Sequence, residues 1–112
     1  MNSSIERLEI MFEKMLQDGF DTVKPLKWGF YFFDSNRDKL YKVYEELKDK
    51  EYKLENIIQM DDGLWRLFVS KVDTLTPEKL HKRNVAFNEL AEYCSVSLYD
   101  GWDVEKLSNT LQ

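Results

Sequence analysis

The sequence predicts a single α+β domain in which helices cover one face of an antiparallel sheet. Three observations indicate this fold class: an aromatic strand, a hairpin signal between two alternating runs, and apolar residues at helical spacing in three other stretches. In the stretch Trp28–Asp34, five of the seven residues are aromatic, and large side chains point to both faces. A strand that is apolar on both faces belongs in the middle of a sheet, so we place Trp28–Asp34 at the centre.

Length and composition are typical of one globular domain. The chain has 112 residues, 43% of them hydrophobic, which is enough for a core without metals or disulfides. Its formal net charge of -5 disfavours a nucleic-acid surface, since such surfaces rely on Lys and Arg, and favours a basic protein partner. No apolar run approaches membrane-spanning length, and Met1–Glu13 lacks the pattern of a signal peptide. We therefore expect a location in the bacterial cytoplasm.

The chain begins with a predicted amphipathic helix. Asn2–Ser4 offer capping groups, and apolar residues recur every three or four positions within Ile5–Met15. We expect this helix to end at Gly19, because glycine readily takes the left-handed conformation that closes helices. The stretch Asp21–Pro25 is then a short connector to the aromatic strand.

Two further helices have recognisable start signals. Asp34–Asn36 precede apolar residues at helical spacing, and this second helix is expected to reach about Lys50. The third helix opens with Thr76–Glu78, where threonine caps, proline fits the first turn and glutamate favours the positive helix end. Its apolar stripe ends at Cys94.

The remaining strands are predicted on either side of the third helix. Tyr52–Met60 and Leu64–Val72 flank Asp61–Gly63, and Asp-Gly between alternating runs indicates a tight hairpin. Ser95–Trp102 is the last predicted strand, and Val104–Gln112 is expected to be a short helical or frayed tail.

The predicted order is helix, strand, helix, strand, strand, helix, strand. With right-handed crossovers, this order gives a ferredoxin-like four-stranded antiparallel sheet of order 4-1-3-2 with an extra N-terminal helix. Trp28–Asp34 and Leu64–Val72 are then central. The other two strands lie at the edges, where another chain is able to pair.

The search for catalytic chemistry is negative. His81 is the only histidine and is interpreted as exposed among charged neighbours. Cys94 is the only cysteine, so an internal disulfide or a cysteine metal cluster is impossible, and its place on an apolar stripe indicates a buried thiol. Asp61 and Asp62 are explained by the turn. We therefore expect no catalytic residue, no metal site and no cofactor.

An RNA-binding sheet is the alternative that the aromatic residues raise. Tyr31, Phe33 and Phe68, with Arg66 beside them, would lie on one face and offer rings for base stacking. The Lys/Arg-Gly-Phe signature of RNA-recognition sheets is missing, and the acidic balance opposes phosphate binding. We favour rings that are covered by the N-terminal helix or by a partner.

Four stretches together resemble one family. They are Tyr99–Trp102 closing the last strand, the strand Trp28–Phe33, the hairpin residues Gly63–Trp65, and the helix start Thr76–Glu78. In these residues the chain resembles the RraB family, regulator of ribonuclease E activity B, over approximately residues 5–103. The resemblance implies one domain over 1–112, with a helix and connector in 1–25, a core in 26–103 and a tail in 104–112.

The resemblance also implies a function without catalysis. A member of this family binds an endoribonuclease and lowers its activity towards RNA. Candidate contacts for such a partner are the following residues: Tyr99, Asp100, Trp102, Asp61, Asp62, Tyr31 and Phe33. Tyr99 and Trp102 are equally well explained as packing residues. Two other functions stay open: an immunity protein that neutralises a toxin nuclease, and a small-ligand or RNA-binding module that uses the open sheet face.

Overall fold

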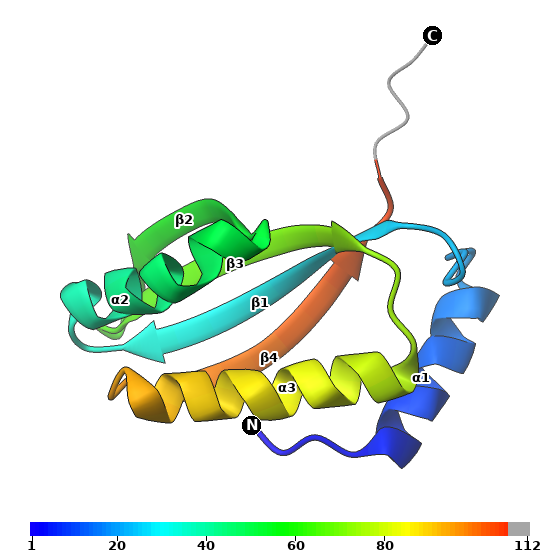
Figure 1. Ribbon diagram of the computed structural model, residues 1–112, viewed down its shortest axis with the longest axis horizontal. Coiled ribbons are helices and arrows are strands. Elements are labelled where there is room, and N and C mark those ends of the chain that lie inside the picture. The colour runs from blue at the N-terminus through cyan, green and yellow to red at the C-terminus, as the bar shows by residue number, and fades with distance from the viewer. Residues whose placement is uncertain (108–112) are drawn as a thin grey trace, which may run out of the picture.

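The computed structural model describes residues 1–107 and shows three helices on one face of a four-stranded antiparallel sheet (Figure 1). The elements in chain order are α1 (Ile5–Gln17), β1 (Leu26–Asp34), α2 (Arg37–Leu47), the short 3-10 helix η1 (Lys48–Lys50), β2 (Lys53–Gln59), β3 (Trp65–Asp73), α3 (Pro77–Tyr93) and β4 (Leu98–Glu105). The strand order β2-β3-β1-β4 confirms the predicted topology, with the aromatic strand β1 in the interior of the sheet.

The core lies between β1 and the helices. Trp28, Phe30 and Phe32 alternate along β1 and are fully buried. Phe87 of α3 packs edge-on against Phe30, with ring centroids 5.0 Å apart, and Phe12 of α1 stacks on Trp28 at 5.8 Å. These contacts make β1 the strand onto which two helices pack.

The N-terminal helix α1 covers the Trp28 side of the sheet, and not the side of Tyr31 and Phe33. Its buried residues Leu8, Phe12 and Met15 face the core together with those of α2 and α3. Of the two covers expected for Tyr31 and Phe33, the N-terminal helix or a partner, the helix is therefore ruled out. Within residues 1–107, no helix covers the opposite face of the sheet, which we call the open face.

Helix starts are capped by the residue types that the sequence indicated. The side chain of Ser4 accepts a hydrogen bond from the Arg7 backbone N–H. At the starts of α2 and α3, the side chains of Asn36 and Thr76 accept hydrogen bonds from backbone N–H groups in the first turn of each helix. Helix α1 ends at Gln17, and Gly19 follows with a φ of +90°. None of the helices within the described residues is long and apolar enough to cross a membrane.

Strand β4 differs from the predicted strand Ser95–Trp102. It begins at Leu98, because Ser95 takes a left-handed conformation and Ser97 is held by hydrogen bonds to the Asp34 carboxylate. It also runs to Glu105, so the first residues of the expected tail belong to the sheet, while residues 108–112 lie outside the described part of the chain.

A bulge in β4 decides where its aromatic residues point. The pairing register with β1 shifts between Tyr31 and Phe32, and Gly101 beside the shift has a φ of +128°, which favours glycine. In a regular strand, residues three apart point to opposite faces. The extra residue places Tyr99 and Trp102 on the same face, the one that carries the helices.

Candidate protein-binding surface

Cross-strand pairing arranges the side chains of the open face in rows. Each row runs from β4 through β1 to β3, and the first three rows continue to β2. The first row contains Leu98, Phe33, Arg66 and Ile58, and the second contains Gly101, Tyr31, Phe68 and Asn56. The third contains Asp103, Gly29, Ser70 and Lys53, and the fourth Glu105, Lys27 and Val72. The first two rows are rich in apolar side chains, and the last two carry most of the charged groups.

The third and fourth rows are tied together by an ionic cluster. Glu55 of β2 accepts a hydrogen bond from Ser70 Oγ at 2.6 Å and pairs with Lys27 Nζ at 3.0 Å. The hydrogen bond from Ser70 and the ammonium of Lys27 lower the pKa of Glu55, against the opposing effect of burial. The pKa of Lys27 is raised in turn, chiefly by its hydrogen bond to the Glu55 carboxylate. Glu55, Ser70 and Lys27 therefore satisfy one another in this half of the open face.

The second row is centred on a stacked pair of rings. Tyr31 and Phe68 stack with centroids 4.6 Å apart and planes 11° from parallel, and the Arg66 guanidinium lies 5.2 Å from the Tyr31 centroid. The Tyr31 hydroxyl donates to Asp103 Oδ2 at 2.6 Å. Burial and this hydrogen bond raise the pKa of Tyr31 to about 12, so its phenol stays protonated at neutral pH.

Gly29 gives the Phe68 ring the room that this stack needs. A Cβ atom built on Gly29 would lie 2.5 Å from Phe68 Cε1 and would also overlap a carboxylate oxygen of Asp103. Any larger residue at this position would displace the ring. The glycine in the aromatic strand therefore serves the open face and not the core.

The stacked arrangement disfavours the RNA alternative. Base recognition on a sheet needs aromatic faces that are free to receive bases. Here Tyr31 and Phe68 cover each other, and Arg66 packs on Tyr31. The open face offers side chains that are already in contact, which suits protein contact better than base stacking.

The first row provides exposed apolar side chains at both edges of the open face. Leu98 and Ile58 are each 41% exposed at the two edges of the sheet, and Phe33 lies half-buried between Leu98 and Arg66. Beyond Ile58, the β2–β3 turn carries exposed Asp61 and Asp62. Apolar side chains that flank Arg66 and are bordered by carboxylates at the turn are a typical arrangement of an interface core with a polar rim.

The structure does not bring all the predicted contact residues together. Tyr31 and Phe33 lie on the open face, and Asp61 and Asp62 lie in the turn at its end. The side chain of Asp62 also accepts a hydrogen bond from the Leu64 N–H at 3.0 Å, so it shapes the hairpin. Leu98 and Ile58 were not predicted as contacts, because their position beside Phe33 and Arg66 depends on the pairing register.

The remaining predicted contacts belong to the other side of the sheet or to its edge. Tyr99 is 1% exposed, and its hydroxyl donates to Asn84 Oδ1 at 2.6 Å in the core. Trp102 is half-buried and packs 5.7 Å from Trp28, while Asp100 is exposed at the bulge. Tyr99 is thus a core residue, and its large ring is used for packing.

The structure shows the surroundings of His81 and Cys94, the two residues considered for catalysis. His81 is half-buried, and not exposed as expected, because the N-terminal segment packs on it and Ser3 Oγ lies 2.8 Å from its Nδ1 atom. Cys94 is buried, and burial raises the pKa of its thiol, which disfavours the reactive thiolate. Within residues 1–107, no group of three or more His, Cys, Asp or Glu side chains is placed to hold a metal ion.

Comparison with known proteins assigns the chain to a family. A search of curated proteins returned no match. The model of the family described as "Regulator of ribonuclease activity B" matches residues 6–104, which include every strand core and all three helices apart from the first residue of α1. This match agrees with the resemblance seen in the sequence, and it covers far more than half of the chain. The chain belongs to the RraB family of regulators of ribonuclease activity.

Proposed function

We propose that this protein lowers the activity of an endoribonuclease by direct protein contact, and that the open face of its sheet makes the contact. The family match supports a regulator of ribonuclease activity. The observation that carries the choice of surface is the first row of the open face, where Leu98, Phe33 and Ile58 form a largely apolar strip, with Arg66 between Phe33 and Ile58, and no helix within residues 1–107 lies over it. Exposed apolar strips with a polar border mark interaction sites.

Charge supports the kind of partner. The chain has a net charge of -5, and exposed carboxylates lie beside the strip at Asp61 and Asp62 and in the third and fourth rows of the open face at Asp103 and Glu105. A ribonuclease presents cationic groups where it holds RNA phosphates. An acidic surface around an apolar strip complements such a region, so bound regulator and RNA would compete for it.

The experiment compares exposed apolar positions of equal accessibility on the two sides of the sheet. Leu98→Glu and Ile58→Glu each place a charge in the apolar strip. The control Val85→Glu places the same charge on α3, away from the open face, where Val85 is 43% exposed. The nuclease is first captured from the native cell with the tagged chain, identified by mass spectrometry and purified. Its cleavage of a fluorogenic RNA is then measured with increasing amounts of each variant.

The expected result is that wild type and Val85→Glu lower cleavage alike, and that the two open-face variants need at least tenfold more protein. An anchor in an interface core contributes about 2 kcal/mol or more, which exceeds the roughly 1.4 kcal/mol of a tenfold change. Equal inhibition by all four proteins would contradict the assignment of the open face. Recovery of RNA without any nuclease would contradict the proposed function itself.

A further inference from the structure

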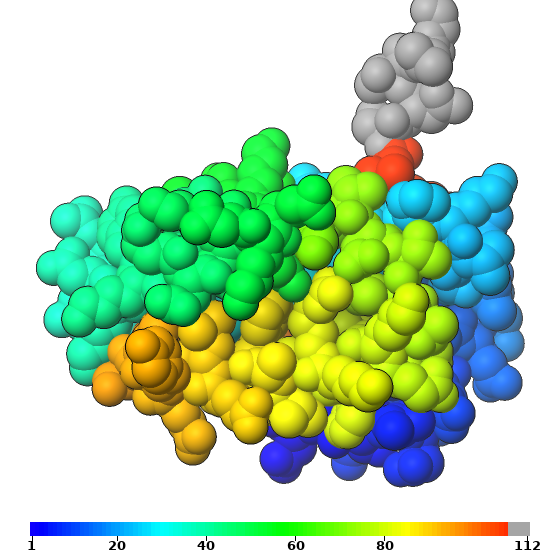
Figure 2. All heavy atoms as spheres, viewed as in Figure 1, coloured from blue at the N-terminus to red at the C-terminus, as the bar shows by residue number. Residues whose placement is uncertain are grey.

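A cavity of about 440 Å³ lies on the other side of the sheet, between the end of α2, η1 and α3. In Figure 2 the green surface of α2 and the yellow-to-orange surface of α3 meet across this face of the molecule. Leu47, Phe87 and Leu90 provide apolar walls, and Tyr52 lies among them just before β2. Its volume falls within the range of about 300–1,000 Å³ that is typical of small-molecule sites.

Tyr52 has a feature that the other buried tyrosine does not share. The residue is only 7% exposed, and its hydroxyl has no hydrogen-bond partner within residues 1–107, although the oxygen is not among the atoms shut off from solvent. The hydroxyl of Tyr99, by contrast, donates to Asn84, and that of half-buried Tyr31 donates to Asp103. Because no protein group accepts from it, the Tyr52 O–H is available as a donor to a ligand in this cavity.

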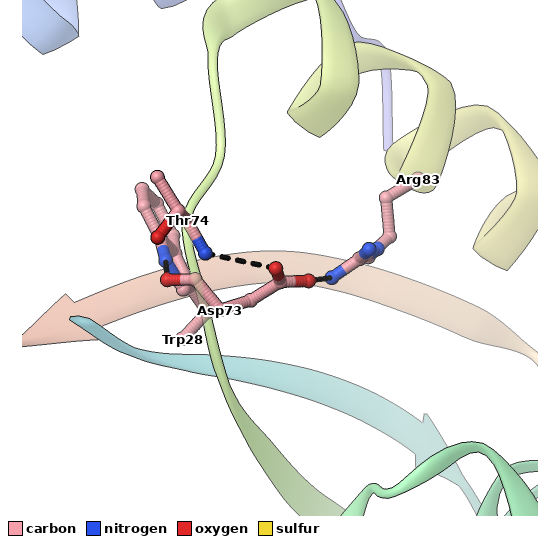
Figure 3. Close-up of polar contacts among 4 residues, drawn as sticks. All are labelled: Trp28, Asp73, Thr74 and Arg83. Atoms are coloured by element: carbon pink, nitrogen blue, oxygen red, sulfur yellow. Dashed lines mark hydrogen bonds and ion pairs between the residues drawn. The ribbon is translucent and has the colours of Figure 1, made fainter. Parts of the chain in front are cut away.

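A fixed cation lies beside Tyr52. Arg83 Nη1 binds Asp73 Oδ2 at 3.0 Å, and the Thr74 N–H binds the other oxygen of the same carboxylate at 2.8 Å (Figure 3). Asp73 is fixed in turn, because its carbonyl accepts a hydrogen bond from Trp28 Nε1 at 3.0 Å. The Arg83 guanidinium lies 5.9 Å from the centroid of the Tyr52 ring and uses one nitrogen for Asp73. Its remaining N–H groups are donors for an anion.

The charged side chains that line the cavity balance one another. Lys50 and Arg83 are cationic, and Glu46 and Glu89 are anionic. Arg83 and Asp73 act on the Tyr52 phenol, Lys71 Nζ lies 5.2 Å from the centroid of its ring, and burial is the main effect that raises its pKa to about 12. The phenol therefore remains a neutral donor. A ligand with one anionic group and an apolar body fits this lining better than a multiply charged one.

We propose that this cavity binds a small aryl carboxylate, whose carboxylate accepts hydrogen bonds from Tyr52 Oη and Arg83 and whose ring packs against Phe87 and Leu90. Because the cavity lies on the helix-covered side of the sheet, its ligand and a protein on the open face can be bound together. The proposal does not depend on the identity of the nuclease.

The test uses the whole chain and 3-phenylpropionate as the probe. Binding is followed by the chemical shifts of backbone amides around Phe87 and Leu90 in NMR titrations. Tyr52→Phe removes only the hydroxyl, and Tyr41→Phe is the matched control on the outer side of α2, where Tyr41 is 43% exposed. The neutral compound 3-phenylpropanamide is the control for the carboxylate.

We expect saturable shifts for wild type and Tyr41→Phe, and about tenfold weaker binding for Tyr52→Phe, as loss of a hydrogen bond to a charged group predicts. The melting temperature of Tyr52→Phe should stay within about 1 °C of wild type, because the hydroxyl has no protein partner. Arg83→Lys keeps a cation for Asp73 and should also weaken binding. Equal affinity for the neutral amide, or unchanged binding by both Tyr52→Phe and Arg83→Lys, would overturn the proposal.

Discussion

Asp34 connects the end of β1 to the start of β4 through one buried carboxylate. It is 2% exposed and accepts hydrogen bonds from the N–H of Asn36 at 2.7 Å and from the N–H and Oγ of Ser97 at 2.9 and 2.8 Å. Burial alone would raise the pKa of Asp34, but these hydrogen bonds outweigh it and lower the pKa below its ordinary value. A carboxyl with a lowered folded-state pKa stabilises the fold above its unfolded pKa of about 3.9.

Asp34→Asn is therefore expected to lower the free energy of unfolding by about 1–3 kcal/mol at pH 7, since hydrogen bonds to a charged acceptor are lost. The difference from wild type should shrink as the pH falls below about 4 and through the lowered folded-state pKa, because the wild-type carboxyl then becomes neutral. Urea unfolding at pH 7 and at pH 2.5 measures both values. Asp61→Asn, in the exposed turn, is the control. An equal penalty at the two pH values would show that charge is not the cause.

Among the elements, β4 shows most clearly what the sequence can and cannot predict. The caps of α2 and α3 and the Asp-Gly hairpin depend on local chemistry, and all three are found where they were predicted. The limits of β4 depend on distant partners, since Asp34 fixes Ser97 and the bulge forms against Tyr31 and Phe32. Simple alternation would send Tyr99 and Trp102 to opposite faces, and only the bulge places both among the helices.

The position of Trp102 leads to a prediction at the level of this strand. Its ring packs 5.7 Å from Trp28 on the helix-covered side and is half-buried. Trp102→Ala should therefore lower the free energy of unfolding by about 2–3 kcal/mol, somewhat less than for a fully buried tryptophan. Trp102→Phe, which keeps an aromatic ring, should recover most of this loss. Urea unfolding provides the values, and an unchanged melting temperature together with lost nuclease binding would identify Trp102 as a contact residue instead.

At the scale of the whole molecule, the sheet separates two surfaces with different chemistry. The faces of β1 and β3 follow from alternation, so the sequence was sufficient to place Tyr31, Phe33 and Phe68 together. The apolar strip with Leu98 and Ile58 could not be predicted, because it needs the register of both edge strands. The cavity at Tyr52 could not be predicted from the sequence either, since it depends on how far apart α2 and α3 lie over the sheet.

The net charge of the molecule predicts how binding to a basic nuclease responds to salt. An acidic protein with a net charge of -5 is attracted to a cationic partner over distances that salt screens. Between about 50 and 300 mM salt, we expect the association rate to fall about tenfold and the dissociation rate to change little, because the apolar strip is insensitive to screening. Stopped-flow mixing with the captured nuclease measures both rates.

Two charge reversals distinguish a local from a global origin of this attraction. Asp61→Lys and Glu13→Lys each change the net charge by two, from -5 to -3, but the first lies beside the open face and the second on the exposed side of α1. If the carboxylates that border the apolar strip guide the encounter, Asp61→Lys slows association several-fold more than Glu13→Lys. If both variants slow it equally, net charge alone attracts the nuclease, and the open face would have to be identified by its apolar contacts.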